Sequence, residues 1–402
     1  MQLCKYYPVA NDRMGTIWTL SSIKGACLIE FGPSGTTHYA VEAIGSLNGQ
    51  DEANIYSTHM DQSDITFGKY DRLEQAILEL DENISPKYIF VMASSISSII
   101  GADIESVCYQ LTNQVKATLI PITTGGLKYQ YPVGVEQTLQ LLVEKIVQEH
   151  PQETAKYNIL GFTIDKYNFL SDVEELKRIM KELFDKDINT VFTCETSIED
   201  IETASRASLN IVIRQEALKA AQLMKEKYGI PYIYQNLYGL QNMQTFIEAV
   251  SQIPTYQLNQ VRYEQEVAMI KKHLFSVKRK FFFYKETKKC AIFGDYDTVI
   301  GISNLLKELN LEVDRQEVLH VITNEADLIS NVPEFNRRKY LSEQELLILL
   351  GDGATLDMKH HSKLDIQISN PNLDKILTYP YTPYIGFRGM SYLIEKILNM
   401  KL

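Results

Sequence analysis

The chain has 402 residues, a formal net charge of −11, 45% hydrophobic residues and 23% charged residues. This length allows two or three domains, and the composition is typical of a globular protein. The acidic balance argues against a general nucleic-acid-binding protein, which needs a basic face. No apolar run is long enough to span a membrane, and the N-terminal segment lacks the apolar core of a signal peptide. We therefore expect a cytoplasmic protein with no nucleic-acid partner and no membrane partner.

The first part of the chain alternates short apolar runs with longer amphipathic stretches. Strands that alternate with helices predict a parallel sheet that is covered by helices. The predicted strands are 26–31, 87–94 and 117–124, and the predicted helices are 99–115 and 134–150. We expect a first domain over residues 1–150, which ends at a polar, proline-containing segment.

The same alternation occurs twice more, which predicts a second domain over 151–280 and a third over 281–402. In the second domain the predicted strands are 157–163, 189–194 and 208–214, and the predicted helices are 172–184, 197–207, 216–229 and 242–253. A long helix over 257–289 leads to predicted strands at 289–294, 316–323, 344–351 and 364–369, and to a C-terminal helix within 382–402. The predicted fold class is α/β, with three Rossmann-like, doubly wound parallel-sheet domains. Ligands of such sheets bind beyond the carboxyl ends of the strands.

The first strand runs into the glycine-rich turn "FGPSGTTH", residues 31–38. Its backbone N–H groups precede a predicted helix, so the turn could bind a phosphate group. However, the Gly-Lys-Ser/Thr sequence of a P-loop is absent. A plain turn between a strand and a helix is the alternative.

The five cysteines are scattered, and none forms a Cys-x-x-Cys pair. This pattern excludes a zinc ribbon and a thioredoxin-like motif, and an odd number is not a disulfide framework. A metal site would have to assemble from residues far apart in the sequence, or from two chains. Cys4 differs from the other four because it precedes the first predicted strand.

Several separated motifs, in order over most of the chain, resemble the component 1 proteins of nitrogenase and their relatives. This family includes the nitrogenase subunits, cofactor-assembly scaffold subunits, dark-operative protochlorophyllide reductases and the reductive cyclase of coenzyme F430 synthesis. The segments that carry the resemblance are the opening motif Cys4…Pro8…Gly15, 25–40 "GACLIEFGPSGTTHYA", 57–77, 86–107, 122–134 "ITTGGLKYQYPVG", 207–250, 288–313 and 382–397 "TPYIGFRGMSYLIEKI".

The resemblance implies three Rossmann-like domains with the active site between them. It also implies a dimer of two component 1 chains, with the same chain or a different one as partner, and an iron–sulfur cluster at the dimer interface. A separate ATP-hydrolysing iron protein docks there and delivers electrons. The three cluster cysteines of the family correspond to Cys4, Thr36 and Ser95, and Gly35 lies in the turn that borders this interface.

Only Cys4 keeps a thiol at these positions, and hydroxyl groups are poor iron ligands beside thiolates. Cys27 lies on the strand, nine residues before Thr36. One hypothesis is that Cys4 and Cys27 of two chains hold a [4Fe–4S] cluster. A second is that Cys4 alone contributes and a different partner subunit supplies the other ligands. A third is that the cluster is lost and Cys27 is a buried packing residue.

The cysteine that holds the nitrogenase cofactor corresponds to Arg214, and residues 374–380 contain no histidine. We therefore expect neither that cofactor nor dinitrogen reduction. Arg214 would suit an anionic group such as a carboxylate, and a surface ion pair is the alternative. The predicted function is a nitrogenase-like reductase subunit that acts on an organic or tetrapyrrole substrate. The alternative is a non-catalytic scaffold or metallocofactor carrier that pairs with a cysteine-complete partner.

Overall fold

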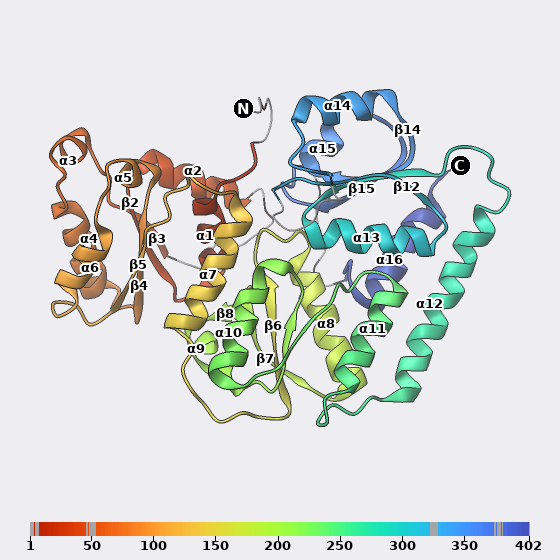
Figure 1. Cartoon of the computed structure of the whole chain (residues 1–402), viewed down its shortest axis with the longest axis horizontal. Coiled ribbons are helices and arrows are strands. Elements are labelled where there is room, and N and C mark those ends of the chain that lie inside the picture. Colours follow the sequence, from red (N-terminus) through yellow and green to blue (C-terminus); the bar gives the residue numbers. More distant parts are fainter. Residues whose placement is uncertain are drawn as a thin grey trace.

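The computed structural model describes residues 4, 8–45, 47, 54–321, 329–373, 375, 379 and 381–401. Three parallel sheets with helices on their faces make up the molecule (Figure 1). The first sheet lies on the left of the view, the second at the centre below, and the third at the upper right. The predicted α/β class with three parallel-sheet units is therefore confirmed.

The first sheet has the strand order β3-β2-β4-β5. Its strands are β2 (Cys27–Phe31), β3 (Asn54–Ser57), β4 (Tyr88–Ala93) and β5 (Thr118–Ile122). Its helices are α1 (Asp12–Ser21), α2 (Ser34–Gly45), α3 (Gln62–Phe67), α4 (Asp71–Asn83), α5 (Ser95–Ile99), α6 (Ile104–Leu111) and α7 (Tyr131–Lys145). The single helix predicted over 99–115 is wrong in its first part. Gly101 has a φ of 69°, and Asp103 caps a new helix by accepting a hydrogen bond from the backbone N–H of Ser106.

The second sheet has the order β10-β9-β6-β7. Its strands are β6 (Lys156–Phe162), β7 (Asp187–Thr193), β9 (Asn210–Val212) and β10 (Tyr232–Tyr234). Its helices are α8 (Phe169–Phe184), α9 (Ile198–Glu202), η1 (Thr203–Arg206), η2 (Gln215–Ala217), α10 (Leu218–Tyr228) and α11 (Leu240–Ser251). A short pairing of β1 (Ile23–Lys24) with β8 (Thr196–Ser197) joins the first unit to the second.

The third sheet has the order β13-β12-β11-β14-β15. Its strands are β11 (Lys289–Gly294), β12 (Glu312–Val318), β13 (Ile329–Ser330), β14 (Glu345–Asp352) and β15 (His361–Ser369). The helices of this part are α12 (Gln260–Lys280), α13 (Tyr296–Glu308), α14 (Glu334–Glu343), α15 (Gly353–Asp357) and α16 (Gly386–Asn399). Residues 322–323, the end of one predicted strand, lie outside the described part of the chain.

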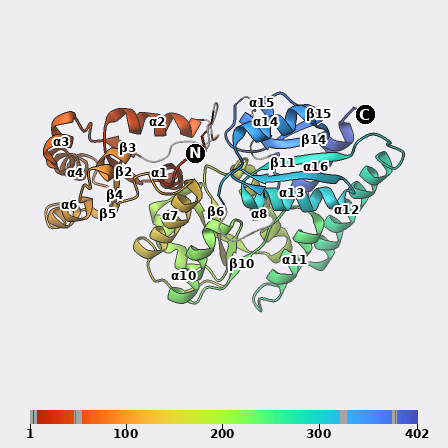
Figure 2. The same ribbon diagram turned by 45° about the horizontal axis from the view of Figure 1, so that its top comes forward.

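The linking helix α12 is shorter than the predicted 257–289 and ends at Lys280. The Lys280 ammonium group donates hydrogen bonds to the carbonyl groups of Ile397, Leu398 and Met400, which satisfies the end of α16. The C-terminal helix α16 packs against α8, α11 and α12, so it returns to the second sheet unit (Figure 2).

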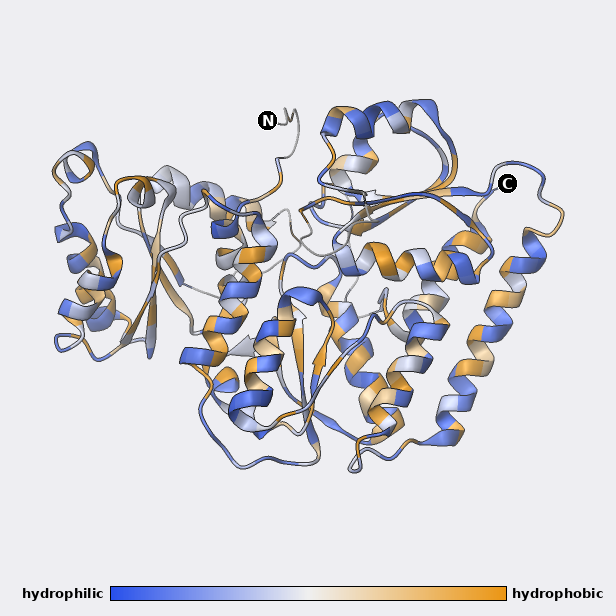
Figure 3. Ribbon diagram, in the orientation of Figure 1, coloured by the Kyte–Doolittle hydropathy of each residue, from blue (hydrophilic) through white to orange (hydrophobic). Residues whose placement is uncertain are grey.

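The hydropathy pattern follows this arrangement, with apolar strands inside and charged residues on the outer faces of the helices (Figure 3). All residues of β2 and β4 are buried, as expected for strands in the middle of a parallel sheet. None of the described helices has the length and apolar character that crossing a lipid bilayer would require.

Helices α1 and α7 approach each other closely through two glycines. A Cβ atom on Gly134 would overlap the carbonyl group of Asp12, and one on Gly15 would overlap that of Tyr131. We expect Gly134→Ala to lower the free energy of unfolding by about 1–3 kcal/mol, because the helices would have to move apart. Urea unfolding followed by circular dichroism measures this change.

The matched control is Gly35→Ala in α2. A Cβ atom there meets nothing within 4 Å, so this variant should be neutral or slightly stabilising. Equal midpoints for the two variants would contradict the close helix contact.

Candidate active site between the three sheets

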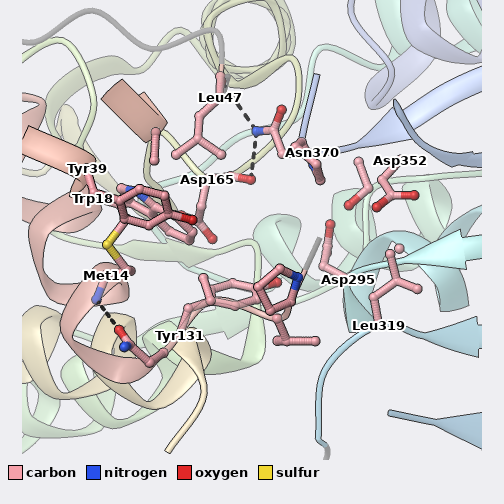
Figure 4. A pocket seen from close by; sticks show the side chains of 18 of the residues that line it. Met14, Trp18, Tyr39, Leu47, Tyr131, Asp165, Asp295, Leu319, Asp352 and Asn370 are labelled. Atoms are coloured by element: carbon pink, nitrogen blue, oxygen red, sulfur yellow. Dashed lines mark hydrogen bonds between the residues drawn. The ribbon is translucent and has the colours of Figure 1, made fainter. Parts of the chain in front are cut away.

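A cavity of about 380 Å³ lies where the three sheet units meet (Figure 4). Its volume falls in the range of roughly 300–1,000 Å³ that is typical of small-molecule sites. Asp165, Asp295, Asp352 and Asn370 line it. The first two and Asn370 follow β6, β11 and β15, and Asp352 is the last residue of β14. The cavity therefore lies beyond the carboxyl ends of strands, where ligands of doubly wound sheets bind.

The wall formed by the first unit is apolar and aromatic. Trp18 of α1, Tyr39 of α2 and Tyr131 of α7 line it. The rings of Trp18 and Tyr131 have their centroids 5.7 Å apart. Burial and neighbouring carboxylates raise the pKa of Tyr131 well above its usual value, so its phenol remains a proton-bearing hydrogen-bond donor.

The opposite wall carries charged groups on the third sheet unit (Figure 4). Asp295 caps α13 and forms an ion pair with Lys166, whose ammonium nitrogen lies 2.7 Å from Asp295 Oδ1. Burial alone would raise the pKa of Asp295, but Lys166 lowers it to about 2. This carboxylate is therefore ionised, and the pair connects the second unit to the third.

Arg214 lies behind the cavity wall, and its side chain is only 1% exposed. Its guanidinium group is 2.8 Å from Asp165 Oδ2 and 2.8 Å from Glu216 Oε2. The alternative prediction for Arg214, an ion pair at the surface, is therefore wrong. The carboxylates that pair with it, Asp165 at Nη1 and Glu216 at Nε, belong to the same chain. The buried Nη2 atom has no hydrogen-bond partner among the described residues.

The sequence pointed to Arg214 but not to Asp165, Lys166 or Asp295. A signal existed for all three, because each follows the carboxyl end of a predicted strand, in "GFTIDK" and "IFGDYD". Asp352 follows a predicted strand in the same way. Polar residues directly after predicted strands therefore predict the cavity better than Arg214 does.

The turns after β2 and β4 lie against each other at the edge of the first sheet. Thr36 is in the first turn of α2, and its hydroxyl donates to the carbonyl of Pro33 at 2.7 Å. The Ser95 hydroxyl donates to the carbonyl of Gly125 at 2.7 Å. An added Cβ atom on Gly32 would overlap Ser94 and would lie 3.4 Å from Thr36 Oγ1, so the two turns are close. Gly35 faces open space.

The two candidate thiol ligands lie in different environments. Cys4 is exposed, and its Sγ donates to Glu334 Oε2 of α14 at 3.0 Å. Cys27 is fully buried at the start of β2, in an apolar cluster with Ile29 and Ile89. Thr36 follows the other end of β2, about 13 Å farther along at ~3.3 Å per residue.

Burial raises the pKa of the Cys27 thiol to about 11, so this thiol is protonated near neutral pH. A protonated thiol in an apolar core is not a metal ligand. Of the alternatives that the sequence left open for Cys27, the structure favours packing.

The sequence resemblance implies an iron–sulfur cluster, and its ligands would have to come from these residues. Among the described residues, no group of three or more histidine, cysteine, aspartate or glutamate side chains is arranged to hold a metal ion. Four of the five cysteines are buried, so two copies of this chain would present only two accessible thiols. A [4Fe–4S] cluster usually needs about four thiolates. The residues of this chain alone do not fit such a cluster.

The fold and the cavity define a class of three-unit α/β proteins with a ligand site at the junction of the units. The profile of the nitrogenase component 1 type oxidoreductase family matches residues 12–401. The chain therefore belongs to this family.

Two distant relatives match nearly the whole chain. The nitrogenase iron-molybdenum cofactor biosynthesis protein NifE of Clostridium pasteurianum is 24% identical over 398 residues, which are 94% of this chain and 85% of that protein. A light-independent protochlorophyllide reductase subunit of Nostoc punctiforme is 23% identical over 99% of this chain and 84% of its own length. The solved structure "Nitrogenase Cp1 at pH 6.5" superposes with a TM-score of 0.80 at 16% identity, covering 99% of this chain and 94% of that chain.

Proposed function

We propose that this chain is the substrate-binding subunit of a nitrogenase-like reductase that reduces a small organic molecule rather than dinitrogen. The observation that carries the proposal is the composition of the cavity wall. The described residues that line the cavity include no cysteine and no histidine, which are the usual ligands of iron-containing cofactors. The wall instead offers aromatic rings, carboxylates and a guanidinium group, which suit an organic ligand.

The size of the cavity favours a compact substrate. Its volume of about 380 Å³ is near the lower end of the range for small-molecule sites. A compact organic molecule therefore fits better than a tetrapyrrole macrocycle. In this role the ionised pair of Asp295 and Lys166 fixes two units around the substrate, and the neutral phenol of Tyr131 can donate a hydrogen bond to it.

Electrons would have to come from partners. One relative is named as a subunit of a light-independent protochlorophyllide reductase, which supports a role within an assembly of several chains. In our proposal a component 1-type partner supplies most of the thiolates of an interface cluster, and Cys4 is the one thiol that this chain presents there. An ATP-dependent iron protein would reduce that cluster. When bound, the cluster would supply single electrons for reduction of the substrate.

A carrier of a metal cofactor is the second candidate function. The similarity to NifE, a cofactor biosynthesis protein by name, favours it. The cavity argues against it, because the described lining residues offer no thiol or imidazole to hold a metal cargo. We therefore place the carrier second.

The test is anaerobic purification of the full chain, alone and with its component 1-type partner, followed by iron and sulfide analysis and EPR spectroscopy. We expect little iron on the chain alone and about four irons per heterodimer. The EPR signal of the heterodimer should respond to the iron protein and ATP. Cys4→Ala should lower the iron content of the heterodimer, whereas Cys27→Ala, the matched control, should leave it unchanged.

Two results would overturn the proposal. About four irons on the homodimer would mean that this chain holds a cluster without a different partner. A metal cofactor that copurifies in the cavity, with no ATP-dependent reduction of the assembly, would establish the carrier function instead.

A further inference from the structure

Asp352 differs from the other two carboxylates that line the cavity. Asp165 is paired with Arg214, and Asp295 is paired with Lys166. Asp352 has no cationic group within 4 Å among the described residues, although it is only 4% exposed. Its Oδ1 accepts a hydrogen bond from the backbone N–H of Thr355 at 2.7 Å. A buried carboxylate without an ion-pair partner is costly, and a cation in the cavity would offset that cost.

Arg337 is the cation that lines the cavity near Asp352, but its hydrogen bonds are directed elsewhere. Its Nε lies 3.3 Å from Glu317 Oε1, and its Nη1 donates to the hydroxyl of Thr355 at 3.0 Å. Glu317 is fully buried and also pairs with Arg315. Arg337 therefore forms its ion pair with Glu317. Burial raises the pKa of Asp352 overall, and Arg337 acts on Asp352 only through its charge, which lowers that pKa. A ligand cation beside Asp352 would favour the ionised carboxylate in the same way.

The aromatic wall faces this carboxylate across the cavity (Figure 4). The faces of Trp, Tyr and Phe rings attract cations, and several such rings beside carboxylates are typical of sites for organic ammonium groups. Trp18 also has an indole N–H group without a hydrogen-bond partner among the described residues. A ligand that carries an acceptor as well as a cation would complement both walls.

We propose that the cavity binds a compact organic cation, whose charged group lies between Asp352 and the aromatic face of Trp18, Tyr39 and Tyr131. This inference rests on the proposed function, because it names the substrate class of the same cavity. The cation can be a quaternary ammonium or a protonated amine, since both carry the charge that Asp352 and the rings attract.

Matched probes isolate the contribution of the charge. Choline and its neutral carbon isostere dimethylbutanol form one pair, benzylamine and benzyl alcohol form the second, and benzoate is the anionic comparison. Binding to the purified full chain is measured by calorimetry and by the fluorescence of Trp18, which is the single tryptophan of the sequence and lines the cavity. We expect at least one cation to bind about tenfold more tightly than its neutral isostere.

Two variants connect the preference to the cavity. Asp352→Asn removes the charge but keeps an oxygen that can cap α15, so the fold should be retained. We expect it to reduce the preference for the cation to within about twofold. Tyr39→Leu removes a 65% exposed ring at the cavity and should weaken cation binding several-fold, whereas the control Tyr109→Leu, at an 83% exposed ring of α6, should not.

Equal binding of cation and isostere, preference for benzoate, or no binding of any probe to folded wild-type protein would each overturn the inference. The titration needs no electrons, no iron protein and no partner chain, so its result is separate from that of the reductase test. Cation binding without ATP-dependent reduction would refute the proposed reductase and leave the ligand class intact. ATP-dependent reduction by an assembly that shows no preference for cations would support the proposed reductase and refute the ligand class.

Discussion

Arg214→Met is expected to lower the free energy of unfolding by about 3–5 kcal/mol. The guanidinium group is buried and forms ion pairs with Asp165 and Glu216 at 2.8 Å each. Methionine would fill much of the space but would leave two carboxylates in the interior without their cation. Urea unfolding of the full chain, followed by circular dichroism, measures the loss.

Two control variants separate the charge from other effects of substitution. Arg214→Lys keeps the charge but cannot make both directed hydrogen bonds, so its cost should be smaller than that of methionine. Arg279→Met changes an exposed arginine in the last turn of α12 and should shift stability by no more than about 0.5 kcal/mol. If Arg214→Met and Arg279→Met unfold at the same urea concentration, the buried ion pairs of Arg214 do not contribute the expected free energy of unfolding.

The surroundings of Arg214 could not be predicted from the sequence, for a physical reason. Asp165 precedes it by 49 residues and lies on a different connection of the second unit, so only the folded sheet brings the two together. Gly161 also contributes, because a Cβ atom there would overlap the aliphatic part of the Arg214 side chain. Pairwise contacts of this kind leave no periodic trace in the chain.

Features that depend on local periodicity were predictable. Continuous apolar runs predicted buried strands such as β4 and β14, because parallel strands are covered on both faces. The same logic left a packing role for Cys27 open beside a ligand role, because Cys27 lies in such a run. The division of the predicted helix 99–115 was harder to predict, since it depends on the backbone conformation of one glycine, Gly101.

One part of the cavity was predictable from the sequence, and another part depends on tertiary packing. The carboxylates of the cavity lie at or just after strand ends, which the sequence marks, but its aromatic wall comes from α1, α2 and the start of α7. These helices face the third sheet unit because whole units pack together, which the sequence does not show.

The missing thiols at Thr36 and Ser95 were visible in the sequence, and the structure adds that both hydroxyls already donate to backbone carbonyls. A partner chain therefore remains necessary to the cluster in our proposal.

Asp172→Asn is expected to remove a pH-dependent loss of stability. Asp172 is 2% exposed, and its Oδ1 accepts a hydrogen bond from the backbone N–H of Tyr384 at 2.6 Å. Burial raises the pKa of this carboxyl group to about 7. Because the folded protein holds this proton more tightly than the unfolded chain, stability from this group is present at low pH and is lost as the pH rises toward 7.

Asparagine keeps the accepting oxygen and has no proton to lose. The stability difference between the variant and the wild type should therefore grow by up to about 1.4 kcal/mol per pH unit between pH 4 and 7 and then level off. Urea unfolding at several pH values measures this difference. The control is Asp185→Asn, at an exposed position where Lys181 lowers the pKa of the carboxyl group, so its effect belongs to more acidic pH. Parallel pH profiles for wild type and Asp172→Asn would mean that Asp172 is ionised in the fold throughout this range. The contact between Asp172 of α8 and the backbone of Tyr384, before α16, would then accommodate an ionised carboxylate in the interior.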